Sequence, residues 1–208
     1  MSVATVIAYC DLLAVGVFAA SGALAAAEKR LDILGFVLFG TITGVGGGTL
    51  RDLLLQLPVF WISETRYLWI CIAVSSLTWY LAPMLSARRR LLLWADAMGL
   101  ALFSVLGCAK AIQFNAPWMV AIVMGVMSAS FGGLLRDTLL RRDSVLLGQD
   151  IYVTAALVGA CSYVALLQAP GVVASYALLL AMIPAFVLRA GAIKSGWRLP
   201  SYRRLGDS

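Results

Sequence analysis

The chain contains an internal duplication. Residues 40–55, GTITGVGGGTLRDLLL, and residues 125–140, GVMSASFGGLLRDTLL, share a pattern of glycines in an apolar segment that ends in Leu-Arg-Asp. The same offset of 85 residues carries Asp11 onto Asp96, and 13 of the 57 positions that begin at Asp11 are identical. Nine of those 13 are glycine, charged or aromatic, types that rarely match by chance among leucines. The sequence therefore predicts two copies of one structural unit.

The composition places these copies in a membrane. The chain is 62% hydrophobic and 12% charged, whereas a globular protein is about half apolar and about a quarter charged. A bilayer core about 30 Å thick needs roughly 20 apolar residues per helix. The period-two alternation of a β-barrel is absent. We predict an all-α integral membrane protein with seven transmembrane helices, at about 5–27, 33–55, 65–86, 91–111, 117–140, 148–168 and 171–189.

The cations predict the orientation of these helices. Twelve lie in loops or the tail on one side: Lys29, Arg30, Arg88, Arg89, Arg90, Arg141, Arg142, Arg189, Lys194, Arg198, Arg203 and Arg204. The opposite side has Arg66 and, at the membrane edge, Lys110. By the positive-inside rule the N-terminus faces out and the C-terminus faces the cytoplasm of a bacterial-type inner membrane. The basic charge thus indicates contact with anionic lipid headgroups rather than nucleic acid.

Each copy holds three spans, an odd number, so the second copy enters the membrane from the opposite side. Inverted repeats of this kind are typical of membrane transport proteins, with the functional site near mid-depth between them. We predict one transmembrane domain over residues 1–189, with repeats at about 5–86 and 91–168 and an extra helix at 171–189. Residues 190–208 are expected to form a basic cytoplasmic tail.

Small residues recur every four positions in the second and fifth spans, at Gly40, Gly44 and Gly48 and at Gly125, Ala129 and Gly133. Such a stripe fits close helix packing of the GxxxG type. Gly46 and Gly47 extend the first stripe to three consecutive glycines. Each glycine lowers helix stability by roughly 1 kcal/mol relative to alanine, so the cluster also predicts a kink that frees carbonyl groups to face a cavity.

Charges inside the spans predict ion pairs. A charged side chain at mid-bilayer costs at least about 2.5–3.5 kcal/mol, so it usually pairs or faces a polar interior. Arg51 lies at about the depth of Asp11, and the repeat places Arg136 with Asp96. We predict these two pairs on either side of the glycine-rich centre. The alternative is that they only hold helices together.

Asp52 and Asp137 directly follow the two arginines. Neighbouring residues do not share a helix face. We therefore expect these carboxylates to cap a helix, to pair elsewhere or to contact water.

The sequence lacks the motifs of the common catalytic and metal sites. It has no histidine, and its four cysteines lie in apolar spans without metal-ligand spacing, which favours their role as small buried side chains. P-loop, HExxH, CxxC and TVGYG motifs are also absent. The glycine-rich GVGGGT follows no strand, which argues against a dinucleotide site. We expect no enzymatic activity, no cofactor and no metal site.

At its glycine motifs the chain resembles the trimeric intracellular cation (TRIC) channel family, in particular its bacterial and archaeal members. The matching features are GVGGGTLRD at 44–52, SFGGLLRD at 130–137, the two early aspartates, and seven spans with the N-terminus outside. The resemblance implies a homotrimer with one ion path per protomer, lined by the first, second, fourth and fifth spans and bent at the glycine motifs. Family members conduct monovalent cations, chiefly potassium, and lipid binds near the protomers.

The resemblance thus predicts a potassium-permeable channel, with K⁺ or Na⁺, membrane lipid and further copies of the chain as partners. The expected residues at the bend and along the path are Gly44, Gly46, Gly47, Gly48, Phe131, Gly132 and Gly133, with hydroxyl groups from Thr41, Thr43, Ser128 and Ser130. The expected path or gating charges are Arg51, Arg136, Asp11, Asp96, Asp52, Asp137 and Lys110. Phe131 stands where the first motif has Gly46, which implies a smaller bend and a narrower path in the second copy.

Two other functions fit the same pattern. Inverted repeats with broken helices suit a secondary transporter for a small solute such as glycine equally well. A structural or lipid-handling membrane protein would use the buried charges only to stabilise helices. A channel would conduct ions, a transporter would take up its solute with saturable kinetics, and a structural or lipid-handling protein would do neither.

Overall fold

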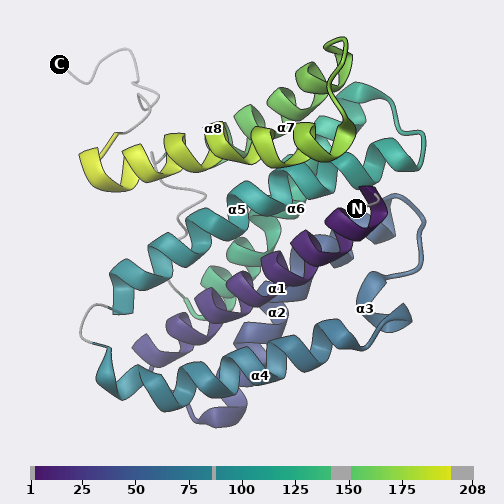
Figure 1. The fold of residues 1–208 in the computed structure, drawn as a ribbon. Coiled ribbons are helices and arrows are strands. Elements are labelled where there is room, and N and C mark those ends of the chain that lie inside the picture. The colour runs from purple at the N-terminus through teal and green to yellow at the C-terminus, as the bar shows by residue number, and fades with distance from the viewer. Residues whose placement is uncertain (1–2, 86–87, 142–150, 198–208) are drawn as a thin grey trace, which may run out of the picture.

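The computed structural model describes residues 3–85, 88–141 and 151–197 (Figure 1). Within these ranges the chain is helical, with elements α1 (Val3–Glu28), α2 (Ile33–Leu54), α3 (Phe60–Ser63), α4 (Arg66–Leu81), η1 (Ala82–Met84), α5 (Arg88–Gln113), α6 (Trp118–Leu139), α7 (Val153–Gln168) and α8 (Ala174–Ser195). The long helices pack side by side in one bundle (Figure 1).

Six of the described helices are long and apolar enough to cross a membrane: α1, α2, α4 with η1, α5, α6 and α8. The apolar helix α7 has 16 residues and so spans about 24 Å at 1.5 Å per residue, less than a bilayer core. The sixth predicted span began at residue 148, and residues 142–150 lie outside the described ranges. The all-helical membrane architecture is therefore confirmed, with six full-length spans and one shorter helix.

Two boundaries and one short helix differ from the sequence prediction. The third span, predicted to reach residue 86, changes to the 3₁₀-helix η1 after Leu81, where Pro83 cannot donate a backbone hydrogen bond. α8 continues past the predicted end at 189 to Ser195 and stops at Gly196, whose positive φ of 67° ends the helix. The four-residue helix α3 was not predicted, because so short a segment has no helical periodicity to detect.

The centre of the bundle is the contact between α1 and α5, which lie side by side in Figure 1. Phe18 of α1 stacks on Phe103 of α5 with ring centroids 5.3 Å apart. These two residues are separated by 85 positions. Equivalent residues of the two copies therefore contact each other in the core.

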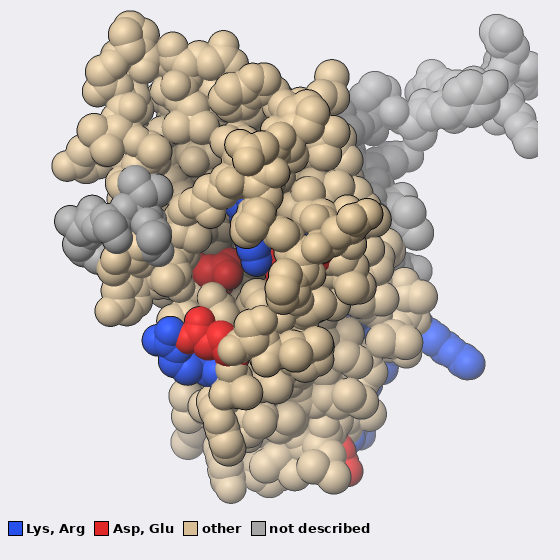
Figure 2. Space-filling view, turned by 90° about the vertical axis from the view of Figure 1, so that its right-hand side faces the viewer, with Lys and Arg blue, Asp and Glu red and all other residues tan. Residues whose placement is uncertain are grey.

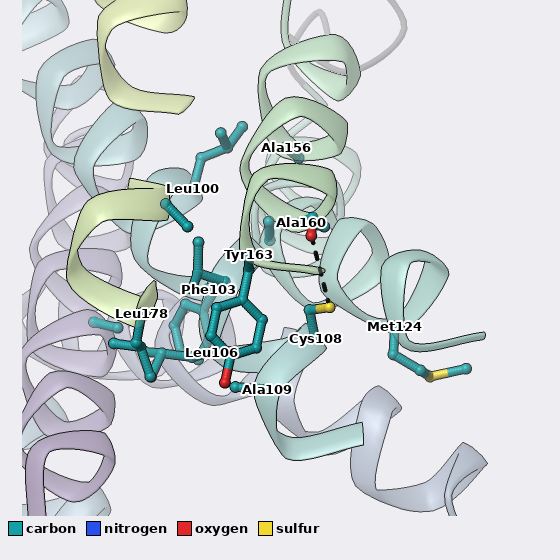
Figure 3. Packing of buried hydrophobic residues seen from close by; sticks show 14 of the residues in the cluster. Leu100, Phe103, Leu106, Cys108, Ala109, Met124, Ala156, Ala160, Tyr163 and Leu178 are labelled. Atoms are coloured by element: carbon teal, nitrogen blue, oxygen red, sulfur yellow. Dashed lines mark hydrogen bonds between the residues drawn. The ribbon is translucent and has the colours of Figure 1, made fainter. Parts of the chain in front are cut away.

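Small side chains bring α5 close to its other neighbours. Figure 3 shows Cys108 of α5 facing Ala160 of α7, where the thiol donates to the carbonyl oxygen at 3.9 Å. Leu178 of α8 and Tyr163 of α7 close the same cluster (Figure 3). Large apolar side chains such as Leu34 and Trp69 instead project outward, as expected of a surface that contacts lipid.

Candidate functional site

The glycines of the repeated motifs lie where α2 crosses α6. A Cβ atom on Gly47 would lie 2.0 Å from the carbonyl oxygen of Ser128, and one on Gly132 would lie 2.3 Å from the carbonyl oxygen of Thr43. The offset of 85 residues relates Gly47 to Gly132 and Thr43 to Ser128. The crossing therefore brings equivalent positions of the two copies together, at a distance that only glycine permits.

Both helices are regular through these glycines. α2 and α6 each form one uninterrupted α-helix. The predicted opening of the backbone toward a cavity is therefore not present in this structure, and close packing, the alternative from the sequence, describes the contact. The backbone of the crossing helix fills the space beside each glycine, and this packing offsets the low helix propensity of roughly 1 kcal/mol per residue.

The other positions of the glycine stripe have different neighbours. A Cβ atom on Gly44 would lie 3.0 Å from the carbonyl oxygen of Val15, and one on Gly46 would lie 3.1 Å from the Leu135 side chain. Phe131, the counterpart of Gly46, lines a pocket of about 210 Å³ beside the crossing, together with Leu50, Met127, Ser130 and Leu134. Phe131 is thus beside the α2–α6 contact in this conformation.

The predicted hydroxyl groups bond to their own helices. Thr43 Oγ1 donates to the carbonyl oxygen of Phe39 at 2.6 Å, and Ser128 Oγ donates to that of Met124 at 2.6 Å. Ser130 Oγ donates in the same way to the carbonyl oxygen of Val126, and the Thr41 side chain is partly buried. These bonds to the preceding turn leave the hydroxyl oxygen lone pairs available as acceptors.

The last glycine of each motif makes room for an aromatic ring beside an arginine. A Cβ atom on Gly48 would lie 2.6 Å from the ring of Phe60, and one on Gly133 would lie 3.1 Å from the hydroxyl oxygen of Tyr152. Each glycine borders a group of charged and aromatic side chains. The first charged cluster comprises Asp11, Arg51, Asp52, Phe60, Tyr67 and Lys110, and the second comprises Ser21, Asp96, Arg136, Asp137, Tyr152 and Arg189.

Asp52 is the centre of the first charged cluster. Its Oδ1 accepts from Arg51 Nε at 2.9 Å, and its Oδ2 accepts from Lys110 Nζ and from the backbone N–H of Phe60, each at 3.0 Å. The predicted pair of Arg51 with Asp11 is therefore wrong. Arg51 reaches Asp52 because the side chains lie in the last turn of α2, where the long guanidinium arm can fold back on its neighbour.

Asp11 instead accepts a hydrogen bond from the Tyr67 hydroxyl at 3.2 Å. It borders a hollow of about 290 Å³ that Lys110 and Glu64 also line. Figure 2 views the end of the molecule that carries α3 and shows acidic and basic side chains set back in a hollow on this face. The Phe60 ring lies near the hollow, 5.9 Å from Arg51 Cζ and 5.7 Å from Lys110 Nζ.

Arg136 is the centre of the second charged cluster. Its Nη1 pairs with Asp96 Oδ1 at 2.8 Å and donates to Ser21 Oγ at 2.6 Å. Its Nε donates to Asp137 Oδ1 at 2.8 Å. The predicted pair of Arg136 with Asp96 is confirmed. The expectation for the two aspartates is confirmed in part. Asp52 pairs elsewhere, with Lys110, and accepts from the Phe60 N–H at the start of α3, but both aspartates also bond to the adjacent arginine, which was not expected.

Arg189 adds a second cation to this cluster. From the sequence, Arg189 belongs with the loop and tail cations at the end of the last predicted span, but it is 2% exposed, with its guanidinium carbon 5.1 Å from the centre of the Tyr152 ring. It is buried because α8 continues beyond it and packs against α5 and α7. The apolar residues around it, Val187, Leu188 and Ala190, are the sequence signal that could have identified a buried arginine.

Four further members of the clusters were also missed. Tyr67 and Tyr152 are identical positions of the two copies, and weighting every identical charged or aromatic position as a site residue would have found them. Phe60 and Ser21 carry no such signal, since their counterparts are Val145 and Leu106. Among the described residues no group of three or more acidic, cysteine or histidine side chains is arranged to hold a metal ion.

Sequence comparisons reproduce the duplication. A family model described as Glycine transporter matches the chain twice, at residues 8–83 and 93–168, which are related by the same offset. A UPF0126 membrane protein from Vibrio cholerae is 37% identical over 199 residues, which cover 92% of this chain and 81% of its relative. The UPF0126 inner membrane protein YadS from Escherichia coli K12 is 34% identical over 199 residues, with 93% and 95% covered.

Solved structures are also similar to this chain over nearly its whole length. A TRIC trimeric intracellular cation channel orthologue from Rhodobacter sphaeroides matches with a TM-score of 0.88 and 45% identity, over 93% of this chain and 100% of that chain. A prokaryotic TRIC channel crystallised in 0.5 M KCl matches with a TM-score of 0.86 and 27% identity, over 94% and 99%. The chain therefore belongs to the prokaryotic TRIC channel family and is a multi-pass membrane protein of the ion-channel class.

Proposed function

We propose that this protein conducts monovalent cations, chiefly potassium, along a path within each protomer of a homotrimer. The path runs between α1, α2, α5 and α6 and connects the first charged cluster to the second through the α2–α6 crossing. The observation that carries the proposal is this crossing, where Gly47 and Gly132 face the Ser128 and Thr43 carbonyl groups in equivalent contacts. A charged cluster lies beside the last glycine of each motif.

We infer that the two copies, α1 with α2 and α4, and α5 with α6 and α7, are inverted relative to one another. Three helices per copy reverse the direction of insertion, and Phe18 meets Phe103 between the copies. This arrangement puts the clusters toward opposite membrane surfaces, with the N-terminus outside. The symmetric crossing then lies near mid-depth, where inverted repeats commonly place their site.

The crossing is closed in this conformation, so conduction requires α2 and α6 to separate. Glycine faces favour such a movement because they carry no side chains that interlock across the contact. Separation would expose the Thr43 and Ser128 carbonyl and hydroxyl oxygens, ligands suited to an alkali cation. Close packing at rest and an opened backbone in the conducting state would thus be two conformations of the same motif.

The ion pairs reduce the barrier that buried arginines would present to a cation. Arg51 is paired with Asp52, and Arg136 with Asp96 and Asp137. An unpaired guanidinium in a narrow path would repel potassium. Asp11 on the hollow adds negative charge at one entrance, which favours cations over anions.

Trimer formation is proposed from the relatives. The solved structure from Rhodobacter sphaeroides is described as a trimeric channel, and this chain covers all of it at 45% identity. Cross-linking of the purified protein in membranes should give a limiting species of three chains.

Reconstitution into planar bilayers tests the proposed function. In a potassium gradient we expect unitary currents, which exceed the turnover of any carrier, with a reversal potential near that of potassium. Arg51→Ala and Arg136→Ala should change conductance or gating, and unchanged currents in both would remove these residues from the path. Saturable glycine uptake with counterflow and no unitary current would indicate a transporter, and the absence of any flux would indicate a structural or lipid-handling role.

A further inference from the structure

A third buried arginine lies outside the duplicated unit. Arg189 belongs to α8, which has no counterpart in the repeat, and its side chain is 2% exposed. Its Nε atom is buried and has no hydrogen-bond partner among the described residues. A membrane arginine near a helix end normally extends toward the interface. The inward orientation of Arg189 therefore requires a specific partner.

That partner is the start of α7. The Arg189 guanidinium carbon lies 5.1 Å from the centre of the Tyr152 ring, and Nη1 donates to the carbonyl oxygen of Ile151 at 3.5 Å. Both residues immediately precede α7 (Val153–Gln168). α8 thus holds the residues that enter α7 by a cation–π contact and a backbone hydrogen bond.

Tyr152 transmits this contact to the second charged cluster. A Cβ atom on Gly133 would lie 3.1 Å from the Tyr152 hydroxyl oxygen and 3.4 Å from Asp96 Oδ1. The phenol and the carboxylate therefore border the same small space, and Asp96 in turn pairs with Arg136. The ring that Arg189 contacts therefore belongs to a residue that lies beside Asp96.

The equivalent tyrosine is held differently. Tyr67 donates to Asp11 and meets the Phe60 ring edge to face, with centroids 4.6 Å apart. Its neighbour Phe60 comes from the four-residue helix α3, so no cation from α8 holds it. In the part of the chain that the structure describes, the cation from α8 contacts the second cluster.

We infer that Arg189 is a positioning residue, which holds Tyr152 against Asp96 and keeps the second end of the path closed. α8 then acts as a latch on this end. Movement of α8 withdraws the cation from the Tyr152 ring, releases the phenol from the space beside Gly133, and frees Arg136 to rearrange. This inference rests on the proposed channel function.

Two substitutions of Arg189 test the latch in planar bilayers. Arg189→Gln removes the cation, and open probability should rise by about fivefold or more at unchanged unitary conductance, because a cation–π contact and a hydrogen bond to the closed state are lost. Arg189→Lys keeps the cation and should restore part of the closure. An unchanged open probability in Arg189→Gln, or an altered unitary conductance, would overturn the inference.

Substitution of Tyr152 provides a second route that leaves Arg189 in place. Tyr152→Leu removes the ring and should reproduce the effect of Arg189→Gln, whereas Tyr152→Phe keeps the ring and should respond less. Equal effects of Leu and Phe would contradict a role for the cation–π contact.

A labelling experiment tests the latch without ion flux. Ser21 and Ser75 are both fully buried, but Ser21 belongs to the second charged cluster, where it accepts a hydrogen bond from Arg136, and Ser75 does not belong to it. With the native cysteines replaced by alanine, Ser21→Cys should react with a water-soluble thiol reagent about tenfold faster when Arg189→Gln is added, and Ser75→Cys should stay protected. Equal acceleration at both sites would show general loosening and refute the latch. Absence of current in the wild type would refute the proposed function alone, since the labelling would still report on Arg189.

Discussion

The two charged clusters are built on the same duplicated residues but differ in their access to solvent. In the first, the Lys110 side chain is 21% exposed and Asp11 borders a hollow of about 290 Å³. In the second, the Arg136 and Asp96 side chains are each 1% exposed. The duplicated acids, arginine and tyrosine therefore do not by themselves decide whether solvent reaches a cluster.

The difference comes from residues that are not duplicated. Each cluster has two acids and two cations, and its second cation is Lys110 in the first and Arg189 in the second. Lys110 corresponds to Ala25 in the other copy, and Arg189 has no counterpart. The second cation thus differs between the clusters, and it is partly exposed in the first and buried in the second.

The largest effect should follow from a methyl group at the crossing. Gly47→Ala and Gly132→Ala place a Cβ atom 2.0 and 2.3 Å from a backbone oxygen. The clash cannot be relieved by a change of rotamer, because the neighbouring atom belongs to the backbone of the other helix. We expect each to lower the free energy of unfolding by about 3 kcal/mol or more, measured by thermal unfolding in detergent. Gly46→Ala is the matched control, since its Cβ would meet the flexible Leu135 side chain at 3.1 Å. Equal stability of the Gly46 and Gly47 variants would contradict the close backbone contact at the crossing, and unequal losses in Gly47→Ala and Gly132→Ala would contradict the equivalence of the two copies there.

The next largest effect should distinguish the two arginines. Arg136→Gln removes the cation that pairs with the buried Asp96 carboxylate, and the loss of one partner of a buried pair costs about 3–5 kcal/mol. Arg51→Gln should cost clearly less, because Lys110 still holds Asp52 and the hollow admits water. The same unfolding measurement applies to both, and equal losses would contradict the contrast between a sealed and an open cluster.

A smaller effect is expected at the open entrance. Lys110→Met leaves Asp52 bonded to Arg51 and to the Phe60 backbone, so stability should fall by about 1 kcal/mol. The entrance loses one positive charge, and unitary potassium conductance should rise. Arg66→Met changes an exposed cation paired with Glu64 and should leave both quantities nearly unchanged. A conductance that falls in Lys110→Met would contradict an entrance at the first cluster.

The smallest effect concerns a single hydroxyl. Tyr67→Phe removes the hydrogen bond to Asp11, whose 3.2 Å length and bordering hollow allow water to replace it. We expect a loss of about 1 kcal/mol or less in unfolding free energy. Tyr9→Phe, at a position 64% exposed, controls for removal of a phenol. A loss well above that range would mean that the first cluster is as dry as the second.

The sequence predicted the helices, the duplication and one of the two ion pairs. Arg136 and Asp96 were paired by applying, through the repeat, the argument from depth made for Arg51 and Asp11. The same reasoning failed at Arg51 because depth does not register how far a guanidinium arm can fold back in the last turn of a helix. From the sequence, the glycine motifs fitted either a kink or close helix packing. The structure favours packing, because a Cβ atom on Gly47 would lie 2.0 Å from the Ser128 carbonyl oxygen.

Other parts of the site had little signal in the sequence. Phe60 lies in a helix of four residues, too short for periodicity, and it enters the first cluster through tertiary packing alone. Arg189 follows an apolar span in the manner of a tail cation, and its burial depends on α8 extending to Ser195. Contacts made by residues without an identical counterpart in the other copy are thus the least predictable from the repeat.

The central claim is that ions pass through the α2–α6 crossing, and block at a cysteine there tests it most directly. Thr43 is fully buried at the crossing. In a chain whose native cysteines are replaced by alanine, Thr43→Cys should carry potassium currents that a small cationic thiol reagent blocks irreversibly, and only while the channel is open. Potassium currents that persist after complete modification of Cys at position 43 would show that the path lies elsewhere.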